Sequence, residues 1–227
     1  MIYNLCYVFL LFIIYAVLGW IVEVSSFIIM DKKIVNRGFL IGPYCPIYGI
    51  GLLLITHFLK KYTSSYLVVF VMCIFICMIL EYFTSYIMEK LFNARWWDYS
   101  EKKFNINGRI CLETTIPFGL GGMFVMYIVN PFIEKILNML SKNTLVIVGI
   151  ILMIIFVIDL IVSLITILKV KNIKIEKIKD NTEEINKKVR EYLTKKSIFT
   201  KRLVDSFPNF KFNIISIKNK IVRKKNN

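Results

Sequence analysis

Histidine, acidic residues and recognisable enzyme motifs are scarce in this sequence. The 227 residues include a single His, His57, and 15 Asp and Glu against 30 Lys and Arg. One histidine excludes His-rich metal sites and a proton relay between two imidazoles. The chain has no G-x-x-x-x-G-K-[ST] phosphate loop, no H-E-x-x-H and no G-x-S-x-G. No cofactor and no metal are therefore expected, and any catalysis would fall to carboxylates, Arg or Tyr.

Polar residues are sparse in most of the first 170 residues, where long apolar runs dominate. The chain is 57% hydrophobic, with a mean hydropathy of +0.63, whereas soluble domains have about 45–50% apolar residues. Its apolar runs reach the about 20 residues that a helix needs to cross ~30 Å of hydrocarbon. Lipid offers the backbone no hydrogen-bond partners, so spans of this length are helices. Spans are expected at 2–30, 40–59, 65–92, 109–131 and 143–169.

The fold class that follows is all-α, a polytopic membrane helix bundle of about five transmembrane helices with a basic cytoplasmic helical tail. The expected domains are a transmembrane helical domain over 1–170 and the tail over 171–227. The first apolar stretch has no basic segment before it and is too long for a cleavable signal peptide.

Positive charge is concentrated in the tail. Residues 1–168 hold 12 Lys and Arg against 9 Asp and Glu, and residues 169–227 hold 18 against 6. Basic segments beside a span favour the cytoplasmic side and bind anionic lipid. We therefore expect a multi-pass protein of the cell membrane, with the N-terminus outside and the C-terminus in the cytoplasm. No nucleic-acid motif accompanies the charge, so nucleic acid is not an expected partner.

The tail carries a weak helical pattern. Apolar residues recur every seven positions at Ile178, Ile185, Tyr192 and Phe199. This spacing suits a short coiled coil, a helix lying on the bilayer or a solvated helix, and the pattern leaves these alternatives open.

Carboxylates inside the expected spans are the most informative residues. They are Glu23, Glu81, Glu113 and Asp159. A carboxylate at the bilayer centre costs at least about 2.5–3.5 kcal/mol, so such residues face the bundle interior and are functional by default. Counted along their spans, all of them fall in the cytoplasmic half. The sequence therefore predicts one polar cavity that opens to the cytoplasm.

Two sets of residues extend this predicted cavity along the helices. Glu81, Ser85 and Glu89 follow an i, i+4, i+8 spacing and share one helical stripe. Arg109 and Glu113 are one turn apart and are expected to pair. A purely structural ion pair is the alternative for the second set.

Two loops with unusual composition lie on the same predicted side. Residues 36–49 and 96–109 are rich in Gly, Pro, Asn and aromatics, which indicates tight turns or a broken helix lining a cavity. Interfacial anchoring is the alternative for the aromatics. The candidate substrate-binding residues are Glu23, Arg37, Tyr48, Glu81, Glu89, Trp97, Asp98, Tyr99, Asn107, Arg109 and Glu113.

The two loops and their flanks also resemble a known family. The runs NRGFLIGPYCPIYGIG (36–51) and EYFTSYIMEKLFNARWWDYSEKKFNINGRICLE (81–113) are similar to the ABC-transporter type IV, or CmpB-like, membrane protein family. Transmembrane 229 proteins are similar in the W-D-Y-S portion. The similarity covers about residues 5–168 and leaves the tail outside. It implies a permease-like membrane protein with no established substrate.

Three functions remain open at this point. The first is a transport subunit, which would need an ATPase in trans and a second copy of itself. The second is a membrane enzyme acting on a lipid or isoprenoid-phosphate headgroup, with Arg37 and Arg109 holding the phosphate. The third is a non-catalytic scaffold or sensor whose tail reads anionic lipid. The resemblance ranks transport first.

Overall fold

The computed structural model describes residues 1–32, 34–92 and 94–171, together with residues 194, 199, 201, 202, 205, 211 and 212. Its elements, in chain order, are α1 (Ile2–Asp31), α2 (Pro46–Phe58), η1 (Leu59–Tyr62), α3 (Tyr66–Phe92), β1 (Ala94–Arg95), β2 (Asn105–Ile106), β3 (Ile110–Cys111), α4 (Leu112–Phe124), η2 (Val125–Val129), α5 (Asn130–Met139), α6 (Lys142–Lys171) and β4 (Lys211–Phe212).

Within the described residues, four helical segments are long and apolar enough to cross a membrane: Ile2–Met30, Tyr66–Phe92, Leu112–Met139 and Lys142–Leu168. The all-α membrane class is thus confirmed. The heptad positions of the tail lie outside the described residues except for Phe199, and the division at residue 170 stays a prediction.

The expected span at 40–59 is shorter than predicted. The α2 helix has 13 residues, which amounts to about 20 Å at the α-helical rise. Pro46 occupies the first turn of α2, where its missing N–H costs nothing. Residues 34–45, with Gly38, Gly42 and Pro43 among them, precede it as a non-helical loop. Hydropathy counted the apolar residues of this loop as helix.

The expected span at 109–131 starts and ends later than predicted. Residues 110–111 form a strand, and the helix then continues from Leu112 to Met139 through a π turn at Val125–Val129. Pro131, just beyond this turn, has no N–H to donate and its ring crowds the preceding turn. A wider π turn accommodates that proline without ending the helix.

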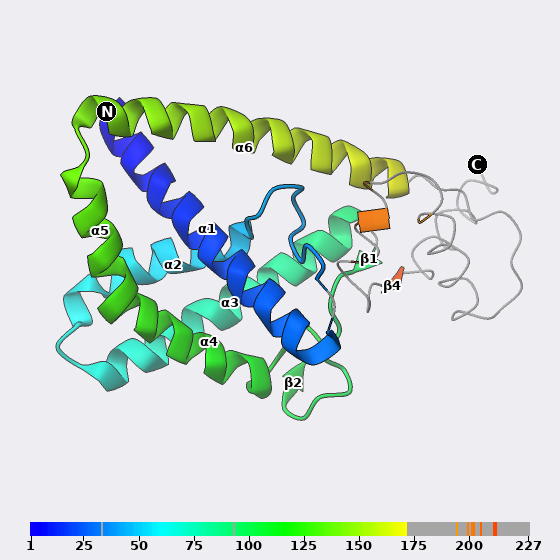
Figure 1. Ribbon diagram of the computed structural model, residues 1–227. Coiled ribbons are helices and arrows are strands. Elements are labelled where there is room, and N and C mark those ends of the chain that lie inside the picture. Colours follow the sequence, from blue (N-terminus) through cyan, green and yellow to red (C-terminus); the bar gives the residue numbers. More distant parts are fainter. Residues whose placement is uncertain are drawn as a thin grey trace, which may run out of the picture.

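The passes of the chain alternate in direction (Figure 1). α1 and α6 run side by side in the same direction, since Cys6 lies against Gly149 and the Phe12 ring against that of Phe156. α2 returns antiparallel to α1, with Gly49 against Phe12. The second pass therefore consists of the 34–45 loop followed by the short α2.

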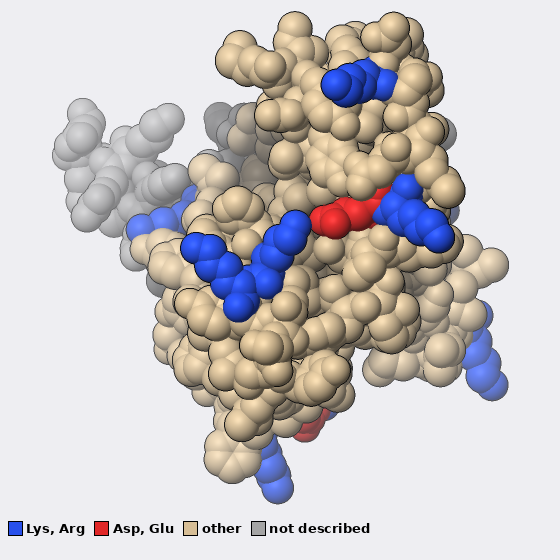
Figure 2. Space-filling view, turned by 90° about the vertical axis from the view of Figure 1, so that its left-hand side faces the viewer, with Lys and Arg blue, Asp and Glu red and all other residues tan. Residues whose placement is uncertain are grey.

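This arrangement gives the bundle two distinct ends. What we call the tail end holds the last turns of α1, α3 and α6 and the 94–111 loop. What we call the opposite end holds the N-terminus, η1 and the α5–α6 junction (Figure 1). η1 contains Lys60 and Lys61, and α6 begins at Lys142. On the face shown in Figure 2, a few Lys or Arg side chains and fewer Asp or Glu side chains lie on a surface made mostly of other residues.

The outer faces of the long helices are apolar. On α6, exposed isoleucines recur every three or four residues along one stripe, at Ile147, Ile151, Ile154, Ile158, Ile161 and Ile165. In water such a stripe would be an aggregation-prone patch, whereas in a bilayer it contacts lipid. The buried residues of α1 pack inward against α5 and α6, and Cys6, Leu10, Tyr15, Ile133 and Leu145 belong to this core.

The close approach of α1 and α2 depends on Gly49. A Cβ added there would lie 2.6 Å from Cδ2 of Phe12 and 2.8 Å from the backbone oxygen of Phe12. We predict that Gly49→Ala lowers the free energy of unfolding by about 1–3 kcal/mol, as over-packing does. Gly121→Ala is the matched control, because nothing lies within 4 Å of a Cβ added at Gly121. Unfolding in detergent checks both variants, and equal stability of the two would contradict the packing account.

Candidate functional site

Glu81 on α3 is the most buried carboxylate of the tail end. Its residue is 7% exposed, and Ser85, one turn further on, is 4% exposed. The Tyr99 hydroxyl donates to Oε1 of Glu81 at 3.2 Å. Oε2 of Glu81 is also buried and has no hydrogen-bond partner within the described part of the chain. Burial and the charge of Glu81 raise the pKa of Tyr99, so the phenol stays protonated and remains a donor.

A second carboxylate approaches from α1. The Tyr48 hydroxyl on α2 donates to Oε1 of Glu23 at 2.6 Å, and Nε of Arg37 lies 3.8 Å from Oε2 of Glu23. The Arg37 guanidinium also covers the Phe27 ring, 4.9 Å from its centroid. Glu23 and Glu81 are close enough to interact electrostatically. Two carboxylates, one on α1 and one on α3, thus face the same region. Each is bonded to one tyrosine, Tyr48 on α2 and Tyr99 in the 94–111 loop.

Arg109 contacts α3 one and two turns beyond Glu81, at Ser85 and Glu89, and it pairs with Glu89. Its Nη2 is 2.7 Å from Oε2 of Glu89, and its Nη1 donates to Ser85 at 3.2 Å. The guanidinium carbon lies 5.7 Å and 5.3 Å from the ring centroids of Tyr82 and Tyr86. With 9% exposure, Arg109 is a buried member of a charge and aromatic network.

The predicted pairing of Arg109 with Glu113 is wrong. α4 begins only at Leu112, so Arg109 precedes the helix and does not share its i, i+4 spacing with Glu113. Glu113 instead pairs with Lys102 at 2.8 Å, and both side chains are more than half exposed. Glu113 is therefore a surface residue and leaves the candidate site.

The 94–111 loop is folded by its own polar side chains. Asn107 and Gly108 both have positive φ, 53° and 65°. They are the central residues of a β-turn between β2 and β3, which the Arg109 amide closes by donating to the Ile106 carbonyl at 3.0 Å. Trp97 donates from Nε1 to the Arg109 carbonyl at 3.0 Å, and Asp98 accepts from the Ser100 amide at 3.1 Å. Trp97 and Asp98 therefore shape the loop that presents Arg109.

Two other loop residues connect this hairpin to the bundle. Asn107 donates to the Tyr82 hydroxyl on α3 at 2.9 Å. Trp96 is one of the aromatics for which interfacial anchoring was the alternative. It is buried at 4% exposure and packs against Phe39 and Phe92. The hairpin is thus attached to the tail end of α3 and to the 34–45 loop.

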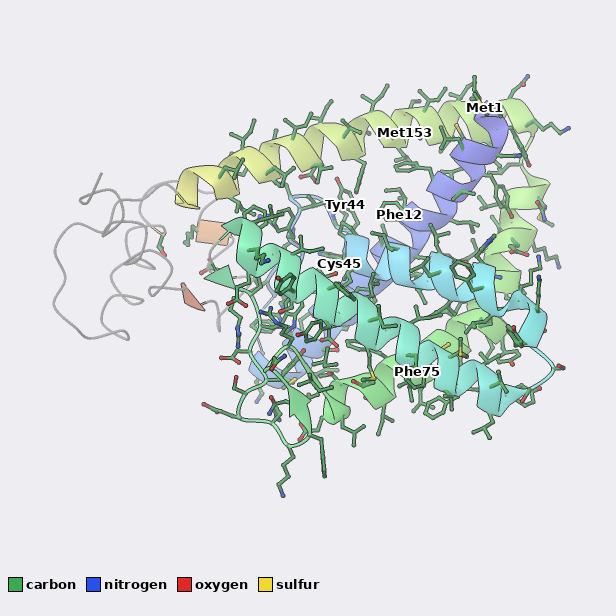
Figure 3. All side chains as sticks on the ribbon, turned by 180° about the vertical axis from the view of Figure 1, so that it is seen from behind. Met1, Phe12, Tyr44, Cys45, Phe75 and Met153 are labelled. Atoms are coloured by element: carbon green, nitrogen blue, oxygen red, sulfur yellow. The ribbon has the colours of Figure 1, made fainter. Side chains whose placement is uncertain are left out.

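Asp159 on α6 organises the 34–45 loop. Its carboxylate accepts from the amides of Ile41 at 2.9 Å and Gly42 at 2.7 Å, and also from the hydroxyls of Tyr44 and Ser163. Tyr44 and Cys45 lie near the middle of the bundle, between α6 and α3 (Figure 3). Non-helical backbone at this depth needs such partners, because lipid supplies none.

Asn36 completes the folding of this loop. Its Oδ1 accepts from Trp20 Nε1 at 2.7 Å and from the Gly38 amide at 2.9 Å, and its Nδ2 donates to the Ile41 carbonyl at 2.8 Å. Asn36 and Asp159 are therefore positioning residues. Neither was among the candidate substrate-binding residues, although Asp159 was singled out as a carboxylate inside an expected span and Asn36 lies in one of the two unusual loops. Neither signal reveals the partner of the side chain.

The structure thus separates the predicted residues into three groups. Glu23, Tyr48, Glu81 and Tyr99 come together, with Arg37 at the edge. Glu89, Arg109 and Asn107 form the adjoining network, and Trp97 and Asp98 support it. Asp159 and Glu113 stand apart from both.

Together these features define a polytopic helical membrane protein with a polar network at one end of an apolar bundle. A family model described as "Putative ABC-transporter type IV" matches residues 10–164. The chain belongs to this family, and the match runs from α1 into α6 and leaves the basic tail outside. Comparisons with curated proteins and with solved structures found no match.

Proposed function

We propose that this protein is the membrane subunit of a transporter and that the region between Glu23 and Glu81 binds positive charge, carried by the solute or by a coupling ion. The family description supports the transport class. The observation that carries the site is Glu81, a buried carboxylate with one oxygen bonded to Tyr99 and the other without a hydrogen bond among the described residues.

The balance of charges around Glu81 favours a cation. Arg109 forms an ion pair with Glu89, and Arg95 lies between Glu89 and Asp98 at 3.4 Å from each. The distance of 3.8 Å makes Arg37–Glu23 a loose pair. Among the described residues no basic side chain pairs with Glu81. An uncompensated buried carboxylate is costly, and a cation or a proton bound there removes that cost.

The same ion pairs make a lipid-phosphate enzyme the weaker proposal. That activity requires Arg37 and Arg109 to offer their guanidinium groups to a phosphate. Both groups are directed to carboxylates, and Arg109 also donates to Ser85. A phosphate would have to displace Glu89 from a buried pair.

The transport proposal includes partners. The sequence lacks a phosphate-binding loop of its own, so an ATPase subunit in trans would supply nucleotide hydrolysis, and a second copy of the chain would enlarge the enclosed volume. The proposal also has the basic tail contact anionic lipid in the cytoplasm and the N-terminus lie outside a cell membrane. Co-purification of a nucleotide-binding subunit with the tagged full chain from native membranes supports the ABC assignment, and its absence contradicts it.

Glu81→Gln tests the cation site. A ligand that binds only the folded state at 100 times its dissociation constant stabilises by about 2.7 kcal/mol. We expect at least one of Na⁺, K⁺, guanidinium and acid to raise the unfolding temperature of the full chain in lipid nanodiscs. Glu81→Gln should abolish that increase. The separate additions distinguish a metal cation, an organic cation and a proton.

Glu113→Gln is the matched control for this experiment. It also removes one carboxylate at the tail end, but from an exposed pair with Lys102. The control should retain the response of the wild type. If wild type, Glu81→Gln and Glu113→Gln respond identically to every addition, the Glu81 site does not bind positive charge.

A further inference from the structure

The basic tail reaches back to the folded loop of the family core. Arg202 lies in the tail, outside the residues matched by the family model. Its Nη1 donates to the carbonyls of Gly38 at 3.0 Å and Leu40 at 2.6 Å, and its Nη2 donates to the carbonyl of Phe39 at 2.9 Å. Three successive carbonyls thus converge on one guanidinium group. We call these three carbonyls the carbonyl cradle.

The folding of the loop explains why these carbonyls are available. The Asn36 side chain accepts a hydrogen bond from the Gly38 amide, and the Asp159 carboxylate accepts from the amides of Ile41 and Gly42. With its amides held from one side, the loop directs the carbonyl oxygens of residues 38–40 to a common point. Asp159 also interacts electrostatically with Arg202. The cradle therefore combines three oxygen acceptors with a nearby negative charge.

A second contact joins the tail to the same end of the bundle. β4 pairs antiparallel with β1, with Ala94 opposite Phe212 and Arg95 opposite Lys211. Arg95 also contacts Glu89 at 3.4 Å. The described tail residues therefore touch both loops that carry the polar network, at two positions separated along the chain.

We propose that the carbonyl cradle of Gly38, Phe39 and Leu40 is a binding site for a guanidinium group, and that Arg202 of the chain's own tail occupies it as a tethered ligand. The chemistry is specific, because a planar guanidinium presents several N–H donors in a fixed fork, whereas an ammonium is a compact point charge. Arg202→Lys therefore does not reproduce the contacts. The cradle is a second cation site, distinct from the region between Glu23 and Glu81.

Arg202→Ala and Lys201→Ala form a matched pair of variants. Both remove one positive charge at neighbouring positions, and Lys201 is exposed. We expect hydrogen exchange of a peptide covering residues 36–44 in the full-length protein to accelerate about tenfold or more in Arg202→Ala, because loss of local hydrogen bonds favours local opening. Lys201→Ala should exchange like the wild type.

Chemical rescue tests occupancy of the cradle directly. Free guanidinium at low millimolar concentration should restore slow exchange in Arg202→Ala and leave the wild type unchanged, because Arg202 already fills the site. Methylammonium at the same concentration should not rescue. Equal exchange in Arg202→Ala and Lys201→Ala overturns the proposal, as does a failure of guanidinium to slow exchange in Arg202→Ala.

A double variant separates this proposal from the proposed transport site. Guanidinium rescue of Arg202→Ala should persist when Glu81→Gln is added, because the cradle carbonyls belong to the 34–45 loop and not to α3. Rescue that disappears with Glu81→Gln places the guanidinium at Glu81 and overturns the cradle. If the cation site at Glu81 proves wrong and the cradle is right, guanidinium still slows exchange in Arg202→Ala.

Discussion

Arg109→Ala should lower the free energy of unfolding by about 3–5 kcal/mol, because removing one partner of a buried ion pair leaves the other charge uncompensated. Arg109 is 9% exposed and lies 2.7 Å from Glu89. It also donates to Ser85 and contacts the rings of Tyr82 and Tyr86. Chemical unfolding of the purified protein measures this loss.

Lys102→Ala is the control for this prediction, since it breaks an ion pair at the same end of the bundle whose members are exposed. Exposed pairs contribute little, so this variant should unfold like the wild type. A double-mutant cycle of Arg109→Ala and Glu89→Ala should give a coupling of about 1 kcal/mol or more. If the Arg109→Ala and Lys102→Ala variants have the same free energy of unfolding, the Arg109 network does not stabilise the fold.

Asp159→Asn should open the 34–45 loop and lower the free energy of unfolding by about 2–4 kcal/mol, since hydrogen bonds to a charged group contribute about 1.5–3 kcal/mol each. The carboxylate accepts from the amides of Ile41 and Gly42 and from Tyr44. An asparagine offers one oxygen to these donors and turns its NH₂ group toward the rest. Hydrogen exchange of residues 36–44 and unfolding in detergent check the two effects.

Ser163→Ala provides the comparison for Asp159→Asn. It removes a single neutral donor to the same carboxylate and should cost about 1 kcal/mol. Loop exchange in Ser163→Ala should stay near that of the wild type. If Asp159→Asn leaves loop exchange unchanged as well, the loop is held by its other contacts and not by Asp159.

Hydropathy predicted the long helices closely. The expected spans at 2–30, 65–92 and 143–169 correspond to α1, α3 and α6. In lipid, a long apolar run forms a helix because only intrahelical hydrogen bonds satisfy its backbone. The prediction failed at 40–59, where apolar residues continue through a Gly- and Pro-rich loop. Hydropathy sums side chains and does not register that Gly38, Gly42 and Pro43 interrupt the helix.

The candidate site was predicted in part for a similar reason. The stripe of Glu81, Ser85 and Glu89 follows from helix geometry, and the structure buries Glu81 and Ser85 on one face of α3. The partner of Arg109 was not predictable from spacing, since the boundary at Leu112 and the hairpin turn at Asn107 decide it. The roles of Asp159 and Asn36 depend on contacts more than a hundred residues apart or on loop geometry, which no local pattern encodes.

The central claim is that the buried carboxylate of Glu81 binds positive charge. Infrared difference spectroscopy of the full chain in lipid tests this claim most directly. Addition of the cation that stabilises the wild type, or a step in pH, should change a carboxyl or carboxylate band. That band should be missing in Glu81→Gln and present in Glu113→Gln. A wild-type difference spectrum that Glu81→Gln reproduces in full would contradict the account.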